Sequence, residues 1–258
     1  MGLFAPGALM ISIENQLLSR LTSATHVVFF TGAGMSAESG VPTFRGEDGI
    51  WKKLKPEELA NFDAFIRNPE MVWEWYKQRK KIIAEITPHK GYGVIARMER
   101  MFKDVTVITQ NIDNLHRRAG STNVIELHGN IERNYCIECN EPYSNQKILE
   151  SPIVPRCERC GGLVRPDVVW FGENLPEDEW GRAVQAAGSA DVFFSIGTSV
   201  VVYPAASIPQ YARINGAYCV EINPDPTPLF AMMNSVITAK AGEALVALEE
   251  KLLETVRR

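Results

Sequence analysis

Four cysteines in two closely spaced pairs carry the clearest chemical signal in this sequence. Cys136 and Cys139 form one C-x-x-C pair, Cys157 and Cys160 form the other, and 17 residues separate them. Thiolates at this spacing can surround a tetrahedral zinc ion, whereas a redox disulfide would need only one such pair. Four protein ligands leave no open position for water or substrate. The pattern therefore predicts a structural zinc site and disfavours a zinc hydrolase.

A glycine-rich turn is the second candidate for chemistry. The apolar run 26–30 predicts a buried parallel strand, and it leads into Gly32-x-Gly34-x-x-Ala37. In a dinucleotide-binding turn the first glycine allows the bend, the second lets backbone N–H groups approach a pyrophosphate, and the third small residue lets a helix begin close to the strand. The usual acidic ribose ligand about 20 residues later is missing, since segment 57–61 has a helical pattern. An ordinary βα loop is the alternative to a variant dinucleotide site.

Polar residues follow several other predicted strands. These are the loop 110–113, His128 in Leu127-His128-Gly129-Asn130, the turn 197–199 and the turn 223–225. Taken alone, a polar turn or a single histidine is more often structural than catalytic. However, ligands of parallel α/β sheets bind beyond the carboxyl ends of the strands, so we expect these loops to converge on one crevice.

The elements that must position these residues alternate along the chain. Strands are predicted at 105–109, 124–127, 190–196 and 218–222, and helices at 12–21, 71–83, 94–101 and 243–256. Such alternation predicts an α/β fold with a doubly wound, Rossmann-type parallel sheet. We expect this sheet domain to comprise residues 12–45, 91–131 and 166–258. A helical insert (46–90) and the zinc-binding module (132–165) would form a smaller composite domain.

Composition narrows the class of protein. The 258 residues carry a formal net charge of −4, which disfavours general nucleic-acid binding. No apolar run approaches the roughly 20 residues of a membrane helix. Residues 1–10 are apolar but contain no Lys or Arg and lead to no cleavage site, so they do not resemble a signal peptide. We expect a cytoplasmic protein of undetermined oligomeric state.

The segment around the glycine turn resembles a family signature. Gly32-Ala33-Gly34-x-Ser36-Ala37-x-Ser39-Gly40-x-Pro42-x-Phe44-Arg45 is similar to the signature of the sirtuins, the NAD-dependent protein-lysine deacylases, and the likeness continues almost to the C-terminus. It implies NAD as cofactor and acyl-lysine proteins or peptides as substrates. The acyl oxygen would attack C1′ of the nicotinamide ribose, His128 would act as general base, and the products would be nicotinamide and O-acyl-ADP-ribose.

The resemblance also implies roles for the polar loops. Asp113 would accept a hydrogen bond from the nicotinamide carboxamide, Asn111 would act in catalysis, and Val169 and Phe171 would hold the substrate backbone in an exposed-edge strand spanning 168–173. The full set of implied NAD contacts is Gly32, Ala33, Gly34, Glu38, Thr43, Phe44, Arg45, Trp51, Gln110, Asn111, Ile112, Asp113, Gly197, Thr198, Ser199, Asn223, Pro224, Asp225 and Ala241.

Tyr76 and Arg79 bear on the acyl group. They stand at i and i+3 of a predicted helix, so they share a face. A solvated helical face is the plain interpretation of this pair. The surrounding sequence, however, resembles the sirtuin branch that acts on succinyl-, malonyl- and glutaryl-lysine, where a Tyr hydroxyl and an Arg guanidinium bind the distal carboxylate. Thr43, where many sirtuins have Asp, is shared with that branch. His89-Lys90-Gly91-Tyr92 replaces a usual Asn-x-x-His.

Three other functions are alternatives for a chain with these sequence features. A protein ADP-ribosyltransferase would transfer ADP-ribose to a protein nucleophile. A non-catalytic NAD-sensing module would need no base, which the combination of His128, Asn111 and Asp113 argues against. A dehydrogenase is disfavoured by the missing acidic ribose ligand.

Overall fold

The computed structural model describes residues 11–43, 56–151 and 154–257. The predictions for Phe44, Arg45 and Trp51, and for residues 1–10, lie outside the described residues.

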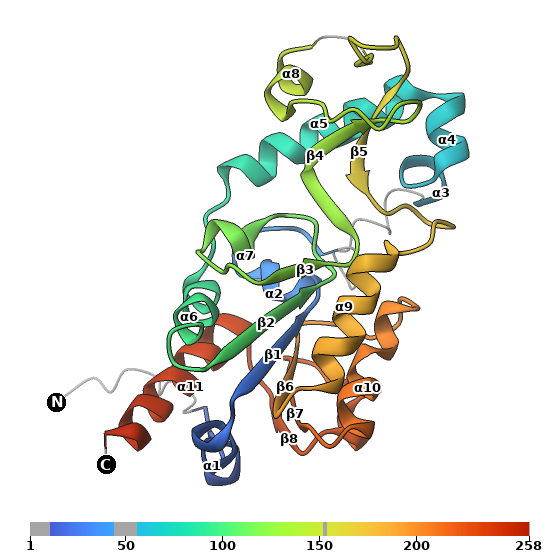
Figure 1. Cartoon of the computed structure of the whole chain (residues 1–258). Coiled ribbons are helices and arrows are strands. Elements are labelled where there is room, and N and C mark those ends of the chain that lie inside the picture. The colour runs from blue at the N-terminus through green and yellow to red at the C-terminus, as the bar shows by residue number, and fades with distance from the viewer. Residues whose placement is uncertain (1–10, 44–55, 152–153, 258) are drawn as a thin grey trace, which may run out of the picture.

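A parallel sheet is the centre of the molecule (Figure 1). Within the described ranges it has six strands in the order β3-β2-β1-β6-β7-β8. Every residue of β1 is buried, and the Phe29 and Phe194 rings stack across the β1–β6 pair with centroids 5.0 Å apart. Apolar runs without alternation therefore form strands covered on both faces. The strand bounds are β1 His26–Thr31, β2 Asp104–Thr109, β3 Val124–Glu126, β6 Val192–Ile196, β7 Tyr218–Ile222 and β8 Ser235–Ile237.

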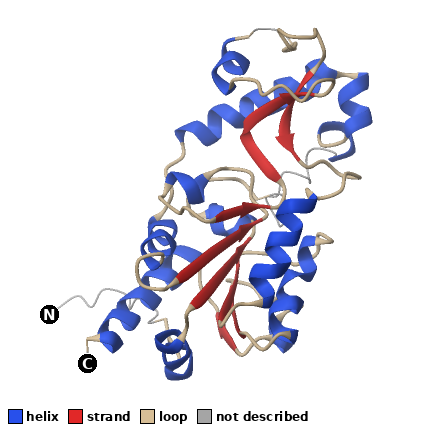
Figure 2. Ribbon diagram, viewed as in Figure 1, coloured by secondary structure: helices blue, strands red, loops and turns tan. Residues whose placement is uncertain are grey.

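Helices cover both faces of this sheet (Figure 2), which confirms the predicted fold class. One face carries α1 (Asn15–Ser23), α6 (Lys90–Met98) and α11 (Ala241–Val256), and the other carries α9 (Glu177–Gly188) and α10 (Ile208–Ile214). The leucines of α1 and of α11 are spaced so that they lie on one side of each helix, and this side faces the sheet. Leu17, Leu21, Leu245, Leu248 and Leu252 are all buried.

A smaller group of elements lies beyond the carboxyl edge of the sheet (Figure 1). The antiparallel pair β4 (Gly129–Cys136) and β5 (Val164–Val168) packs with the long helix α5 (Pro69–Glu85) around Trp73, Ile131 and Trp170. Three short helices complete it: α3 (Pro56–Leu59), α4 (Phe62–Arg67) and α8 (Asn145–Glu150). Asn68 caps α5 by accepting from the Met71 N–H at 3.2 Å, and proline follows as its first residue.

The strand predicted over 168–173 is wrong beyond its first residue, because β5 ends at Val168. The next three N–H groups bond within the molecule: Val169 to the His128 carbonyl (3.0 Å), Trp170 to the Glu173 carboxylate (2.7 Å) and Phe171 to the Ala60 carbonyl (2.9 Å). No helix in the described ranges is long and apolar enough to cross a membrane.

Candidate active site

A cavity of about 850 Å³ lies where the strand ends of the sheet face β4 and β5. Residues from every predicted loop meet in its wall, as expected for the carboxyl edge of a parallel sheet. The predicted site residues that line it are Gly32, Ala33, Gly34, Glu38, Thr43, Tyr76, Gln110, Asn111, Ile112, His128, Val169, Phe171, Gly197, Thr198, Ser199, Asn223, Pro224, Asp225 and Ala241. Asp113 and Arg79 lie outside this wall.

The glycine turn after β1 interlocks with the turn after β6. The Gly34 N–H donates to the Gly197 carbonyl at 2.7 Å, and the helix α2 (Ala33–Ala37) starts at this contact. A Cβ on Gly34 would lie 2.8 Å from the Gly197 Cα, and one on Gly32 would lie 2.7 Å from the Thr198 Cβ. Gly34 also lines the cavity, so its part in letting a ligand approach N–H groups stays a prediction. In this structure the glycine allows two backbone turns to touch.

A buried polar network lies behind the turn. The Asn111 amide donates to the Gly32 carbonyl (2.8 Å) and to the Ser36 hydroxyl (3.0 Å). Ser36 in turn donates to the Asp113 carboxylate at 2.5 Å, which also accepts from the Leu115 N–H. Burial raises the pKa of Asp113, while these hydrogen bonds and nearby arginines oppose the shift. The network fixes Asn111 at the cavity wall.

His128 reaches the cavity with a defined tautomer. Its Nδ1 lies 2.8 Å from the Gln110 carbonyl oxygen, which can only accept, so Nδ1 carries the hydrogen. The contacts of the described residues give no partner to Nε2, which therefore presents a lone pair. Burial lowers the pKa of His128 and the Gln110 hydrogen bond partly offsets this. The ring is thus prepared to accept a proton.

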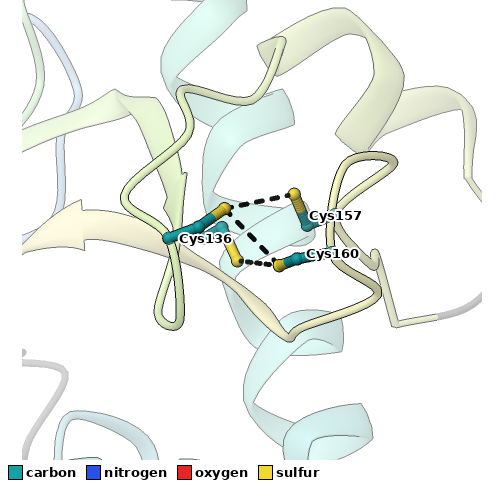
Figure 3. Close-up of side chains that lie close together, drawn as sticks. Cys136, Cys157 and Cys160 are labelled. Carbon is teal, nitrogen blue, oxygen red and sulfur yellow. Dashed lines mark hydrogen bonds between the residues drawn. The ribbon is translucent and has the colours of Figure 1, made fainter.

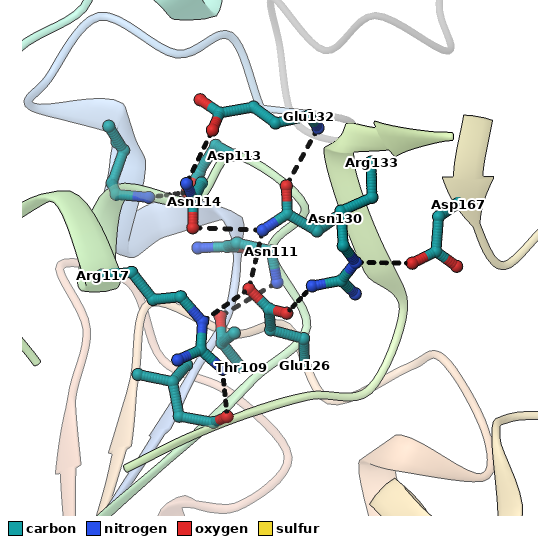
Figure 4. Close-up of polar contacts among 12 residues, drawn as sticks. Thr109, Asn111, Asp113, Asn114, Arg117, Glu126, Asn130, Glu132, Arg133 and Asp167 are labelled. Atoms are coloured by element: carbon teal, nitrogen blue, oxygen red, sulfur yellow. Dashed lines mark hydrogen bonds and ion pairs between the residues drawn. The ribbon is translucent and has the colours of Figure 1, made fainter. Parts of the chain in front are cut away.

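An ion-pair network fixes the segment around His128 (Figure 4). The buried Glu126 carboxylate accepts from Asn130 (2.8 Å), Arg133 (2.6 Å) and Arg117 (3.3 Å), and Arg133 also binds Asp167 at 2.6 Å. These contacts bracket His128 from both sides in sequence and join β3 to the β4–β5 pair.

At the other end of the cavity, three loops are tied together. The Gln110 amide donates to the Thr198 hydroxyl (2.9 Å), and the Asn223 amide donates to the Thr198 carbonyl (3.1 Å). The Glu38 carboxylate accepts from the Gly242 N–H at 2.6 Å, at the first turn of α11. An acidic group at a helix N-terminus is stabilised by the helix dipole. Glu38 thus anchors α11 from the cavity wall.

Tyr76 and Arg79 are buried, with 1% and 8% of their surfaces exposed, so the solvated-face interpretation is wrong. The Tyr76 hydroxyl oxygen accepts from the Trp170 indole N–H at 2.8 Å. The Arg79 guanidinium lies 5.0 Å from the centroid of the Trp75 ring. Burial raises the pKa of Tyr76 to about 12 and lowers that of Arg79.

The four cysteines gather as predicted (Figure 3), and none forms a disulfide. All four sulfur atoms lie within 4.8 Å of one another, with Cys136–Cys160 and Cys139–Cys160 at 3.4 Å and Cys139–Cys157 at 3.7 Å. Four ligands about 2.3 Å from a tetrahedral ion would stand roughly 3.8 Å apart. The cluster therefore has the donor set and size of a structural zinc site.

Comparison with known proteins decides the family. The profile of the Sir2 family matches residues 32–204. The chain belongs to the Sir2 family. It is 50% identical over 230 residues to the NAD-dependent protein deacylase of Aquifex aeolicus (strain VF5), covering 89% of this chain and 96% of the relative. Over 235 residues it is 51% identical to NAD-dependent protein deacylase 1 of Caldanaerobacter subterraneus subsp. tengcongensis, covering 91% and 97%.

Solved Sir2 structures share the fold. A Sir2 homologue in complex with NAD superposes with a TM-score of 0.89 at 43% identity, covering 95% of this chain and 96% of that one. A Sir2 structure with a p53 peptide and NAD⁺ gives 0.82 at 34% identity, covering 94% and 98%.

Sequence reasoning missed part of the cavity wall of this Sir2 protein. Lys240, Trp75 and the segment 202–204 also line it. Lys240 directly precedes Ala241, a predicted NAD contact at the start of α11. Its place next to Ala241 in the sequence could have marked it as a wall residue. Segment 202–204 carries no motif that would have marked it.

Proposed function

We propose that this protein removes acyl groups from protein lysines at the expense of NAD, giving nicotinamide and O-acyl-ADP-ribose. The observation that carries the proposal is His128, held as an Nδ1–H tautomer with Nε2 open in a cavity lined by the glycine turn. The Sir2 relatives named NAD-dependent protein deacylase support it.

The cavity fits a dinucleotide. Its volume of about 850 Å³ and its mainly apolar wall, with a few polar groups at the carboxyl edge of the sheet, are typical of a cofactor site. Bound NAD supplies an electrophilic ribose carbon with nicotinamide as leaving group. We propose that Gly32, Thr198 and Asn223 contact its phosphate and adenosine parts together with the other cavity-lining residues of the predicted set, and that Asn111 and Asp113 serve the nicotinamide end.

His128 is the proposed general base. A neutral imidazole can take a proton from a ribose hydroxyl, and its depressed pKa keeps it neutral near pH 7. The Gln110 carbonyl stabilises the ring once it is charged, because Nδ1–H continues to donate. Asn111, fixed by Gly32 and Ser36, would orient the reacting ribose.

In this proposal the acyl end of the substrate lies against Tyr76, which lines the cavity, and Arg79, one turn further along α5 and outside the cavity wall, is the partner of an acidic tail. An arginine offers a planar fork for bidentate binding of a carboxylate, so acidic acyl groups such as succinyl and malonyl are proposed substrates alongside acetyl. Val169 and Phe171 would contact the substrate backbone with groups other than their N–H groups, which are engaged.

Two further parts of the proposal concern the whole chain. Residues 12–45, 91–131 and 166–258 would act as the NAD-binding unit, with 46–90 and 132–165 as the smaller one. Two of the four chain crossings between these units, at 131/132 and 165/166, fall within β4 and β5, which would connect the units. The four-cysteine zinc site would stabilise the smaller unit and take no part in the reaction.

A mass-spectrometric assay tests the proposal. The chain is incubated with NAD and one peptide carrying acetyl-, succinyl- or malonyl-lysine. We expect nicotinamide release that depends on the acyl-lysine, with the acyl group recovered on ADP-ribose. ADP-ribose attached to protein without dependence on acyl-lysine would favour an ADP-ribosyltransferase instead, and NAD binding without turnover would favour a sensing module.

A further inference from the structure

An ion pair between a buried arginine and a half-buried glutamate lies at the acyl end of the cavity, and the glutamate, Glu173, is itself part of the cavity wall. Arg165 is 4% exposed, and its guanidinium binds both Glu173 carboxylate oxygens, at 2.5 and 2.9 Å. The same guanidinium donates to the Val168 carbonyl at 2.9 Å and stacks on Trp170, 3.7 Å from the ring centroid. The Glu173 carboxylate also accepts from the backbone N–H of Trp170. Arg165 therefore holds the Trp170 ring by stacking, and Glu173 holds its backbone by a hydrogen bond.

Trp170 passes this constraint to Tyr76. Its indole N–H can only donate, and it donates to the Tyr76 oxygen at 2.8 Å. The hydroxyl hydrogen of Tyr76 must then point elsewhere, and the contacts of the described residues give it no acceptor. Because burial raises the pKa of Tyr76 to about 12, the hydroxyl keeps that hydrogen at neutral pH. Tyr76 also lines the cavity, so the hydrogen is available to a bound molecule.

We propose that Arg165 and Glu173 are positioning residues for acyl-group selection: they fix the Trp170 indole, which directs the Tyr76 hydroxyl hydrogen to an acceptor at the far end of the acyl group. The inference rests on the proposed deacylase function and deepens it. Under this inference the site reads two properties of an acyl tail separately: its hydrogen-bond acceptor and its charge. Tyr76 recognises a hydrogen-bond acceptor whether or not it is charged, while Arg79 recognises the charge.

Three acyl groups of similar shape on one lysine peptide distinguish these properties. Succinyl ends in a carboxylate, succinamoyl in a neutral amide with a carbonyl acceptor, and 4-methylpentanoyl in two methyl groups. The full-length protein with NAD is assayed for nicotinamide release, and kcat and KM are measured for each. We expect the unaltered protein to prefer succinamoyl over 4-methylpentanoyl.

Trp170→Phe keeps an aromatic ring but removes the directing N–H together with part of the buried ring volume. It should reduce the succinamoyl to 4-methylpentanoyl ratio of kcat/KM about three- to tenfold, chiefly through KM, as expected for one neutral hydrogen bond. In a Tyr76→Phe background it should have no further effect, because the two groups act as one unit. Arg165→Met should move the ratio in the same direction and Arg165→Lys should restore only part of it, since lysine lacks the planar stacking group.

Arg97→Met is the matched control. It removes an arginine that makes a similar two-pronged contact to Glu249, at 2.7 and 2.6 Å, between α6 and α11 away from the cavity. Its ratio should equal that of the unaltered protein. Tyr76→Phe alone, which leaves Trp170 in place, gives a second test if Trp170→Phe does not fold: it must abolish the acceptor preference.

Several outcomes would overturn the inference. Equal losses on all three tails would mean that Trp170 only supports the fold, and additive effects in the double variant would mean that it does not act through Tyr76. Turnover without any acceptor preference would overturn this inference alone. Absence of turnover on every tail by the unaltered protein would overturn the proposed function and this inference with it.

Discussion

The parallel sheet and the β4–β5 group are stabilised in different ways. Strands β1 and β6 are buried along their whole length and packed by phenylalanine and valine. The β4–β5 group instead buries Lys80 and Arg165, exposed by 3% and 4%, and gathers four sulfur atoms in its outer part. A buried charge is costly without partners, and each of these has them. Apolar burial therefore specifies the sheet, whereas the group that covers the cavity adds zinc ligands and the Arg165–Glu173 ion pair to its own apolar core.

Removing a zinc ligand should have the largest effect, because it should unfold the zinc-binding region and leave the sheet folded. A structural zinc site contributes on the order of 10 kcal/mol to folding. In Cys157→Ser we expect lost zinc and fast hydrogen exchange over residues 136–163, while β1 and β6 stay protected. Uniformly fast exchange over both regions would show that the sheet depends on the metal as well. Loss of activity with unchanged exchange would contradict a structural role.

His128 lies between the sheet and the β4–β5 group, and replacing it tests its proposed role as general base. His128→Ala should retain NAD binding by calorimetry and lower kcat by roughly 10² to 10⁴, the usual cost of losing a general base. Turnover within a few fold of the unaltered protein would rule out this role.

On the sheet side, Gly34→Ala should destabilise the protein by about 1–3 kcal/mol, because its Cβ would meet the Gly197 backbone at 2.8 Å. Urea unfolding measures this. Gly181→Ala in α9 is the control: nothing lies within 4 Å of its Cβ, and a helical Gly-to-Ala change should stabilise by up to about 1 kcal/mol. Equal effects at the two positions would contradict close packing at Gly34.

On the other side, Arg79→Met should lower the ratio of desuccinylation to deacetylation at least about tenfold, since a charge-assisted hydrogen bond contributes about 1.5–3 kcal/mol. Lys81→Met, at an exposed position of the same helix, is the control. An unchanged ratio in Arg79→Met would remove Arg79 from the proposed acyl contacts.

The smallest effect concerns pH. Burial lowers the pKa of His128 below its ordinary 6.5, so its base form persists to lower pH than a free histidine allows. kcat/KM should therefore stay level down to the depressed pKa and fall below it. His116, whose pKa burial lowers to about 3, cannot produce this limb. An acid limb above 6.5 would contradict the assignment.

The same difference explains how much could be predicted from the sequence. Uninterrupted apolar runs such as 26–30 and the leucine spacing of α11 predicted the sheet and its helices, because burial alone decides those elements. Zinc ligands were predictable since their spacing is local. The partners of Trp170 were not, because Arg165, Glu173 and Tyr76 come together only through the β4–β5 pairing and the packing of α5. For the same reason Tyr76 and Arg79 could be read as solvated, and segment 169–173 as a strand.

Glu126 has a consequence for motion. Its carboxylate binds Arg117, which follows β2, and Arg133 of β4, and both arginines are about half exposed. The sheet and the β4–β5 group are thus joined near His128 by two arginines that water reaches and one carboxylate that is buried. Separating the two regions there would leave the buried Glu126 carboxylate without its partners, which is costly. Dissolved salt screens a network around a buried charge only weakly, so we expect the two regions to stay joined near His128 at high ionic strength.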